Sequence, residues 1–214
     1  MKTQRRRDDL ELNIISITPG DLHPRDAYRL MLSIVVPRPI AWVSTLGADG
    51  TINLAPFSFF NAVGGTPPTI MVSVGERAGE PKDTLRNVRE TGEFVVHIAN
   101  ETLIGQLNTT SGDWPYGDNE FDIAGLTQIP STNVKPPRIA EAPVAMECKA
   151  TQIIPVNETH YTMVLGQVLR YHIREDLLGP DNRVKAVELG AVARLGGDEY
   201  TAIDRIFALS RPKV

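Results

Sequence analysis

Residues 37–61 read PRPIAWVSTLGADGTINLAPFSFFN, and this stretch decides the fold. An apolar run at 39–46 predicts a strand, and the turn-forming cluster at 47–50 allows 51–54 to return as the second strand of a hairpin. Pro56 has no N–H to donate to a neighbouring strand, so it predicts a break in sheet pairing soon after the hairpin. The stretch therefore indicates a β protein in which backbone groups near Pro56 are free to face a ligand.

The rest of the chain predicts further strands and a few helices. Short apolar segments separated by Gly, Pro, Asn and Asp residues place strands at 69–74, 93–99, 145–154 and 161–173. Together with the hairpin these make about five or six strands, enough to close a small barrel. Helices are expected at 24–34, 83–89 and 101–108. The segment 109–120 contains Gly, Asp and aromatic residues without a clear period, which predicts a loop or lid.

The composition is that of an ordinary globular domain. The 214 residues are 42% hydrophobic and 22% charged, values typical of a chain that buries a core. We therefore expect one decorated β domain over 21–214, preceded by an N-terminal extension over 1–20. In that extension Arg5, Arg6 and Arg7 are followed at once by acidic residues, where a secretory segment would need an apolar run. They are expected to lie in a solvated, frayed terminus.

Charge and cysteine content narrow the class of protein. The formal net charge is −4, which argues against nucleic acid or a membrane surface as a partner, because proteins that bind them normally carry a basic face. No apolar run reaches the ~18 residues of a membrane-spanning helix. Cys148 is the only cysteine, so the chain can form no internal disulfide, which fits a cytoplasmic protein.

Conventional catalytic motifs are missing from the sequence. There is no GxSxG elbow, HExxH pair, CxxC pair or Walker P-loop, and the histidines have no ligand spacing. His97 and His172 fall within expected strands, where a lone histidine is more often structural. Cys148 is expected to pack as a small hydrophobe. We therefore expect neither a catalytic side chain nor a metal site.

The segment 53–61 is the first candidate for a binding site. A flavin ring needs donors and acceptors along one edge and flat apolar walls above and below, and an interrupted strand next to aromatic residues can supply both. Phe57, Phe59 and Phe60 could equally be ordinary core residues.

A second candidate lies at 76–84, which reads ERAGEPKDT. Lys82 supplies a positive charge and Thr84 a hydroxyl at the expected start of a helix, where free backbone N–H groups favour an anion. The segment therefore predicts a phosphate seat. The alternative is a solvated loop in which Asp83 serves only as a helix N-cap.

Short motifs run through nearly the whole chain in a specific order and spacing. They are PRPIAWVST at 37–45, Gly50, NLAPFSFFN at 53–61, Pro67-Pro68, Lys82-Asp-Thr84, Glu93-Phe94, FDIAGL at 121–126, Glu147-Cys148, Gly166-Gln-Val168 and RLGG at 194–197 with Tyr200. Each motif alone is weak, but the series over about 28–212 closely resembles the flavin reductase-like, FMN-binding family. The resemblance implies a mainly β, six-stranded Greek-key split β-barrel with a few peripheral helices.

The resemblance also implies a homodimer with FMN near the subunit interface. Ser44, Thr45 and the segment 53–61 would lie along the ribityl chain and ring, and Lys82 and Thr84 at the phosphate. Carried over residue by residue, the implied cofactor-binding set is Trp42, Ser44, Thr45, Asn53, Ala55, Pro56, Phe57, Ser58, Asn61, Arg77, Lys82, Asp83 and Thr84. One departure from the family pattern is His97, where a smaller polar residue is expected. Trp114 and Tyr116 lie in the variable lid, so substrate specificity does not carry over.

Family members reduce flavin with NADH or NADPH, and many pass it to a partner monooxygenase. The resemblance therefore implies an NAD(P)H:flavin oxidoreductase in which hydride passes from nicotinamide to the flavin while the protein supplies position and electrostatics. An alternative on the same fold is a non-catalytic FMN-binding electron carrier. A barrel that holds haem or a deazaflavin is a further alternative.

Overall fold

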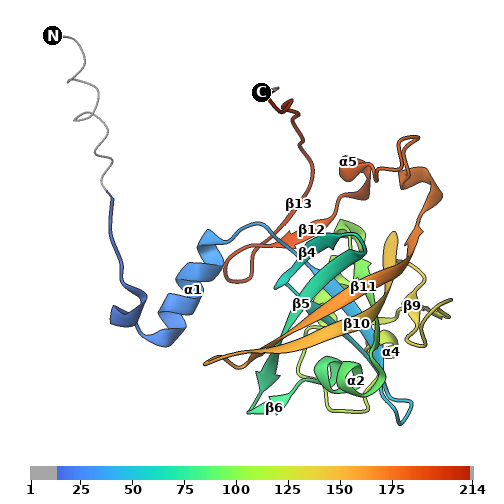
Figure 1. Cartoon of the computed structure of the whole chain (residues 1–214), viewed down its shortest axis with the longest axis horizontal. Helices are drawn as coiled ribbons and strands as arrows, with labels where there is room; N and C mark the ends of the chain where they lie inside the picture. Colours follow the sequence, from blue (N-terminus) through green and yellow to red (C-terminus); the bar gives the residue numbers. More distant parts are fainter. Residues whose placement is uncertain (1–13, 213–214) are drawn as a thin grey trace.

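A curved antiparallel sheet carries the fold in the computed structural model, which describes residues 14–212 (Figure 1). Its strand order is β3-β2-β7-β10-β11-β5-β4, and β6 pairs with β5. These strands are β2 (Ala41–Leu46), β3 (Ile52–Phe57), β4 (Phe60–Gly65), β5 (Pro68–Arg77), β6 (Glu80–Pro81), β7 (Glu93–Ile98), β10 (Val144–Val156) and β11 (Tyr161–Ile173). The prediction for Arg5, Arg6 and Arg7 falls outside the described residues.

Two small sheets and several short helices surround the main sheet. The small sheets are formed by β1 (Arg38–Pro39), β12 (Val192–Arg194) and β13 (Tyr200–Ala202), and by β8 (Gln128–Ile129) and β9 (Arg138–Ile139). The α-helices are α1 (Pro24–Ile34), α2 (Asp83–Thr91), α3 (Ile104–Thr109), α4 (Glu120–Ala124) and α5 (Ala186–Leu189). Turns of 3-10 helix are η2 (Pro19–Asp21), η3 (Glu101–Leu103) and η4 (Glu175–Leu177). Over the described residues, no helix is long and apolar enough to span a membrane.

The sheet closes because β3 and β4 are two halves of one bent strand. Only Ser58 and Phe59 separate them in the chain, yet β3 pairs with β2 at one end of the sheet and β4 pairs with β5 at the other. The carbonyl of Phe59 still accepts a hydrogen bond of 2.8 Å from the Ser73 N–H at the bend. Counted this way, the barrel has six strands, and the predicted mainly β barrel with peripheral helices is confirmed.

Side chains of β2 alternate between two cores, because successive residues of a strand point to opposite faces. Ala41 and Val43 face the barrel interior, where they pack with Phe94, Val72 and other buried residues. Trp42 faces outward into a second core formed with Leu54, Leu107, Phe121 and Ile139. Helix α2 adds Leu85 and Val88 to the interior core. Both faces of β2 are therefore buried, which explains its nearly continuous apolar sequence.

Most predicted elements appear close to the expected bounds. Helix α1 and strand β11 have the predicted limits, and α2 runs two residues further, to a left-handed Gly92 with φ of 69°. The expected strand at 51–54 continues to Phe57, so Pro56 lies within β3, opposite Trp42. Pro56 is tolerated there because β3 is an edge strand, and the missing N–H falls on its open side. The break in pairing comes later, at Ser58 and Phe59.

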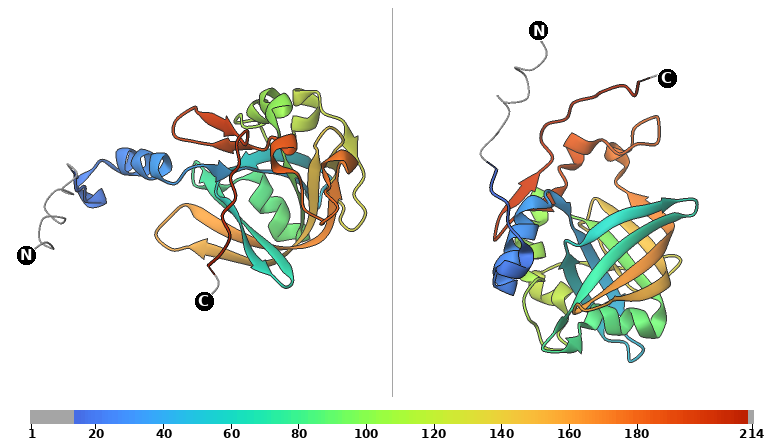
Figure 2. Two further views of the ribbon diagram at one scale, coloured as in Figure 1. Left: turned by 90° about the horizontal axis from the view of Figure 1, so that it is seen from above. Right: turned by 60° about the vertical axis from the view of Figure 1, so that its left-hand side comes forward.

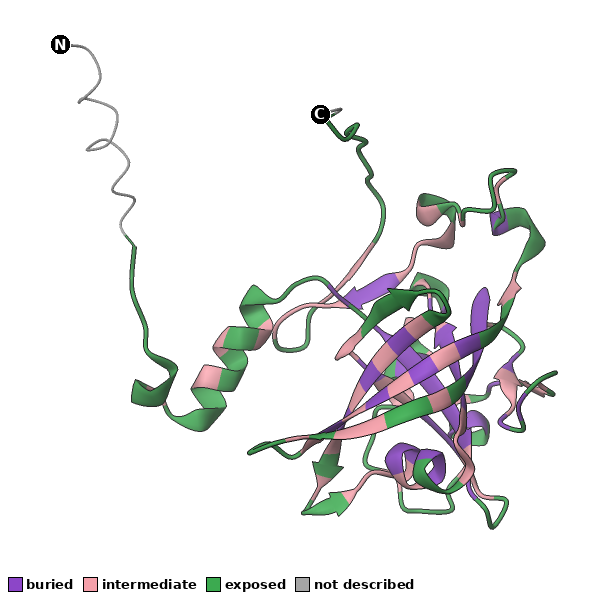
Figure 3. Cartoon of the chain, in the orientation of Figure 1, coloured by how far each residue is buried: buried purple, intermediate pink, exposed green. Residues whose placement is uncertain are grey.

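Helix α1 extends away from the barrel together with residues 14–23, which precede it (Figures 1 and 2). None of its residues is buried (Figure 3). The hydroxyls of Tyr28 in α1 and Tyr161 in β11 form a hydrogen bond of 3.2 Å that links the helix to the barrel. The division into an extension over 1–20 and a domain over 21–214 stays a prediction.

Candidate functional site

A hollow beside β3 and the first turn of α2 brings together most of the predicted cofactor-binding residues. Its lining includes Asn53, Ala55, Pro56, Phe57, Arg77, Lys82, Asp83 and Thr84. The remaining lining residues belong to the segment predicted to be a loop or lid and its end, namely Thr110, Ser111, Gly112, Asp113 and Glu120. The interrupted-strand segment and the Lys-Asp-Thr segment thus face each other across one space.

The first turn of α2 presents free donors to this hollow. Lys82 occupies the N-cap position, and no side chain makes a capping hydrogen bond there. Asp83 is the first helical residue, and its carboxylate accepts a 2.6 Å hydrogen bond from Arg86. The N-cap is therefore Lys82, and Asp83 does not serve as the N-cap. In the first turn the Asp83 and Thr84 amides have no intrahelical partner, whereas the Leu85 amide already donates to the Lys82 carbonyl at 2.9 Å. The two free amides make the start of α2 electrostatically favourable for an anion.

Lys82 and Arg77 differ in how far their charges are already compensated. The Arg77 guanidinium lies 3.7 Å from the Asp113 carboxylate and 4.0 Å from that of Asp83, and it donates a hydrogen bond to the Trp114 carbonyl. Lys82 makes no ion pair with any residue in 14–212. Of the two cations that line this hollow, Lys82 is therefore the one whose charge is available to bind an anionic ligand.

Five of the predicted site residues do not line the hollow, and three of these five are buried in the protein. Trp42, Ser44 and Thr45 are fully buried. The Trp42 indole donates to the Thr110 hydroxyl at 2.8 Å, and Ser44 donates to the Pro137 carbonyl at 2.6 Å. Thr45 accepts a hydrogen bond from Asn87 of α2. These side chains hold together the elements around the hollow.

Ser58 and Asn61 lie outside the first hollow. Ser58 lines a neighbouring hollow that shares Lys82 and Pro56 with the first. Asn61 is exposed in β4, where its side chain accepts a hydrogen bond from the next backbone amide. The bend between β3 and β4 thus separates Asn61 from the residues before it.

The neighbouring hollow has a volume of about 380 Å³ and is bordered by three cations, Lys82, Arg38 and Arg194. Arg38 is only 5% exposed and donates to the carbonyls of Leu32, Val35 and Leu195. The Arg194 guanidinium lies 4.4 Å from the centre of the Tyr200 ring. Arg194 and Tyr200 also border a further hollow of about 580 Å³. We call the two adjoining hollows, which share Arg194 and Tyr200, the groove.

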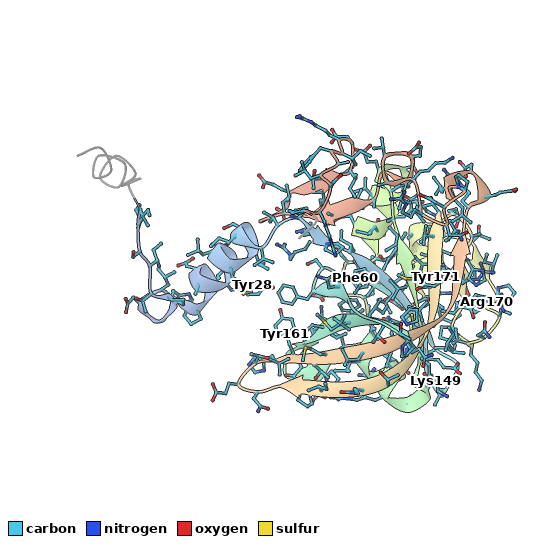
Figure 4. All side chains as sticks on the ribbon, turned by 45° about the horizontal axis from the view of Figure 1, so that its top comes forward. Tyr28, Phe60, Lys149, Tyr161, Arg170 and Tyr171 are labelled. Carbon is cyan, nitrogen blue, oxygen red and sulfur yellow. The ribbon has the colours of Figure 1, made fainter. Side chains whose placement is uncertain are left out.

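An aromatic wall borders the groove beside Lys82. The rings of Phe59 and Tyr161 lie 5.4 Å apart. The Tyr28 hydroxyl contacts that of Tyr161, and Figure 4 labels both tyrosines. These three residues line one hollow of about 170 Å³ with Lys82. The wall joins α1, the β3–β4 bend and β11, which are distant in sequence.

His97 and Cys148 lie in the protein interior and line none of these hollows. Burial lowers the pKa of His97 to about 4; the bond to the Trp42 carbonyl opposes this shift, and the charges of Arg138 and His172 add smaller contributions in the lowering direction. Burial also raises the pKa of the Cys148 thiol. Both side chains are therefore neutral near pH 7 and are suited to packing rather than acid–base chemistry.

Glu120 is the most informative residue that the sequence analysis missed. It is 6% exposed, lines the first hollow and accepts a 2.9 Å hydrogen bond from the Leu54 N–H of β3. Burial raises its pKa, hydrogen bonds from the backbone N–H groups of Leu54 and of Glu120 itself oppose the rise, and the charges of Asp83 and Asp118 add to it. A glutamate ahead of an apolar helix is ordinarily exposed, so nothing in the local pattern indicated its burial.

The fold and sequence match one group of known proteins. A model of the flavin reductase like domain matches residues 31–188. An uncharacterised protein of Halalkalibacterium halodurans is 38% identical over 205 residues, which are 94% of this chain and 98% of that protein. Nitrilotriacetate monooxygenase component B from Bacillus cereus has a TM-score of 0.88 at 38% identity, covering 92% of this chain and 98% of its own. The 2-nitrobenzoate 2-nitroreductase of Pseudomonas fluorescens has a TM-score of 0.84 at 33% identity, covering 92% and 96%.

These matches define a split-barrel protein of the FMN-binding type. The chain belongs to the flavin reductase-like family. The predicted family and its split-barrel fold are thereby confirmed.

Proposed function

We propose that this protein is an FMN-binding NAD(P)H:flavin oxidoreductase. The observation that supports the proposal most directly is Lys82, an uncompensated cation at the uncapped start of α2, across one hollow from β3. Lys82 and Thr84 would hold the FMN phosphate through charge-assisted hydrogen bonds and the first amides of α2. Arg77 would contribute less, because Asp83 and Asp113 already compensate its charge.

Residues of β3 would hold the rest of the flavin. Ala55, Pro56 and Phe57 of β3 would border the ring, with Phe57 providing an apolar surface. FMN, when bound, supplies a hydride acceptor, so the protein needs no nucleophile of its own. Trp42, Ser44 and Thr45 would act by holding β2 and α2 in place, and contact of Asn61 with the flavin stays a prediction.

The groove bordered by Arg38, Arg194 and Tyr200 would take the nicotinamide nucleotide. It adjoins the flavin hollow at Lys82 and Pro56 and has room beyond Arg194. Arg194 has one acidic neighbour among the described residues, Asp198 at 3.7 Å, so it can offer donors to a phosphate. Such a position would bring the nicotinamide and the flavin together, which is the main requirement for hydride transfer.

Helix α1 supports a homodimer. Tyr28, Met31 and Ile34 recur every third residue on α1 and remain exposed in the single chain, Ile34 by 68%. Contiguous apolar surface of this kind is typical of a protein interface. A second copy of the chain would cover α1, and because Tyr28 borders the groove, the interface would lie near the flavin.

Two roles for the reduced flavin fit the similar structures. Nitrilotriacetate monooxygenase component B favours the supply of reduced flavin to a monooxygenase. Similarity to the 2-nitrobenzoate 2-nitroreductase favours direct reduction of an aromatic acceptor. The aromatic wall of Tyr28, Phe59 and Tyr161 could bind such an acceptor, which supports the same role. The alternative from a different class is a non-catalytic electron carrier.

Nicotinamide oxidation tests the proposal. The purified protein should oxidise NADH or NADPH with many turnovers when FMN is in excess. An electron carrier would bind FMN but give no turnover beyond its bound flavin. Absence of flavin binding in a fluorescence titration would contradict the whole proposal. Addition of 2-nitrobenzoate in place of excess flavin separates direct reduction of an aromatic acceptor from flavin supply.

A further inference from the structure

Glu120 places a carboxyl group in the hollow that also contains Lys82, Thr84 and the start of α2. One of its oxygens accepts the Leu54 N–H, which would otherwise be an unpaired donor on the open edge of β3. This hydrogen bond fixes the carboxyl group in the hollow. A charged carboxylate at this position would lie beside any anion bound at the start of α2.

The charged groups around Glu120 do little to neutralise it. Asp83 of α2 and Asp118 of the preceding loop both oppose its ionisation. Arg77 of β5 is paired with Asp83 and Asp113, and Arg86 is paired with Asp83. Lys82 is the only uncompensated cation lining this hollow among the described residues. A bound phosphate and a charged Glu120 would therefore compete for the same lysine.

We propose that Glu120 carries a proton when a phosphate-bearing flavin occupies this hollow, so that FMN binding takes up a proton from solvent at Glu120. This inference rests on the proposed FMN site. Two anions in one partly buried space oppose each other, and protonation of one of them relieves the repulsion. Lys82 and the start of α2 stabilise the charged phosphate, whereas burial already disfavours the charged form of Glu120, so the proton goes to Glu120. The protonated carboxyl keeps a carbonyl oxygen for the Leu54 N–H and gains an O–H that can donate to the phosphate.

The consequence is that FMN affinity falls as pH rises through the ionisation of Glu120. FMN binding raises the pKa of Glu120 further, because the phosphate is a like charge. As pH rises from the pKa of Glu120 in the free protein to its pKa in the complex, FMN affinity falls, by about tenfold for each pH unit that separates the two pKa values. Riboflavin has no phosphate, so its affinity lacks this dependence. Glu120 would thus act as a positioning residue that makes flavin release sensitive to pH.

The test compares FMN and riboflavin affinities across pH in the wild-type protein and in Glu120→Gln. Glutamine keeps an acceptor for the Leu54 N–H and cannot ionise. The ratio of wild-type to variant FMN dissociation constants should rise with pH by about tenfold or more, and the same ratio for riboflavin should stay constant. Using the ratio cancels the titration of the FMN phosphate itself. Asp122→Asn removes a charge from the exposed side of α4 and should leave the wild-type pH profile unchanged.

Several outcomes would overturn the inference. A constant ratio for FMN, with both proteins binding it, would show that Glu120 only caps β3. Equal weakening of FMN and riboflavin at all pH values would place Glu120 at the ribityl chain instead. If the wild-type protein binds neither flavin at any pH, the proposed FMN site is wrong and the inference fails with it. Should Glu120→Gln fail to fold, calorimetry of the wild type in buffers of different ionisation enthalpy must detect proton uptake with FMN and none with riboflavin.

Discussion

The Nε2 atom of His97 lies 3.0 Å from the backbone nitrogen of Ile139, and its Nδ1 atom lies 2.9 Å from the carbonyl oxygen of Trp42. The Ile139 N–H can only donate, so Nε2 accepts and Nδ1 carries the proton that is donated to Trp42. The neutral imidazole of His97, a residue of β7, thus joins its own strand to β2 and to β9. The family pattern expects a smaller polar residue here, and the two hydrogen bonds give His97 a structural purpose.

The first prediction concerns the pH dependence that His97 imposes on stability. Its pKa is about 4 in the folded protein, against 6.5 as the ordinary value. The unfolded chain therefore binds a proton that the folded protein excludes, and stability decreases as pH falls from 6.5 toward 4. The effect is on the order of 3 kcal/mol at the lower limit. His97→Asn should unfold more easily at pH 7, by about 1–3 kcal/mol for the lost hydrogen bond, but should lose this part of the acid sensitivity.

Urea unfolding at several pH values would measure both effects, and FMN titration provides the functional control. His97 lines no hollow near Lys82, so the variant should keep its FMN affinity and its turnover. A loss of about a hundredfold or more in kcat, with folding and FMN binding intact, would instead indicate an acid–base role for His97.

The second prediction concerns Gly166 in β11, where the ring of Phe94 lies too close to the backbone to leave room for a side chain. A Cβ added at Gly166 would lie 2.3 Å from Cζ and 2.9 Å from Cε1 of that ring. Phe94 is buried in the barrel core and cannot move away without displacing its neighbours. Gly166→Ala should therefore lower the free energy of unfolding by about 1–3 kcal/mol. Gly105→Ala is the matched control, because it has open space in α3 and should be neutral or stabilising. Equal stability of the two variants would contradict the role assigned to Gly166.

The sequence predicted most of the sheet because its signals are local. The apolar run at 39–46 and the turn at 47–50 determine a hairpin without help from the rest of the chain. The bend at Ser58 and Phe59 was harder to predict. Pro56 indicated a break, but where pairing changes from β2 to β5 depends on barrel closure, which is a property of all six strands.

The candidate site was predictable where it follows a helix start or an interrupted strand, as at Lys82, Thr84 and Asn53. It was not predictable where burial depends on distant contacts. Glu120 lies in the hollow because α4 packs against β3, and Arg38 is buried because carbonyls from two distant segments surround it. Trp42 and Ser44 belong to a family motif, yet their side chains pack into other parts of the protein.

The third prediction concerns helix α1 and the proposed dimer. Light scattering at micromolar concentration should give twice the chain mass of 23.5 kDa. The double variant Met31→Asp with Ile34→Asp places charges on the exposed apolar face of α1 and should give a monomer, because buried unpaired charges are costly. Arg29→Asp changes an exposed residue on the opposite side of the same helix and should remain a dimer. A wild-type monomer that binds FMN fully would contradict the proposal.

The last prediction concerns Lys82, the uncompensated cation of the flavin hollow. A charge-assisted hydrogen bond to the phosphate contributes about 1.5–3 kcal/mol, so Lys82→Ala should weaken FMN binding about ten- to hundredfold. Riboflavin, which has no phosphate, should bind both proteins equally. Arg89→Ala is the matched control, since Arg89 is an exposed cation in the last turn of the same helix and should leave FMN affinity unchanged. Fluorescence titration measures the FMN and riboflavin affinities of the wild type and of both variants. Because α2 begins at Lys82 without a side-chain cap, removing that side chain breaks no hydrogen bond within the described residues. An unchanged FMN dissociation constant in Lys82→Ala would therefore show that the phosphate does not bind at the start of α2. Equal weakening of riboflavin binding would show that Lys82 contacts a part of the flavin other than the phosphate.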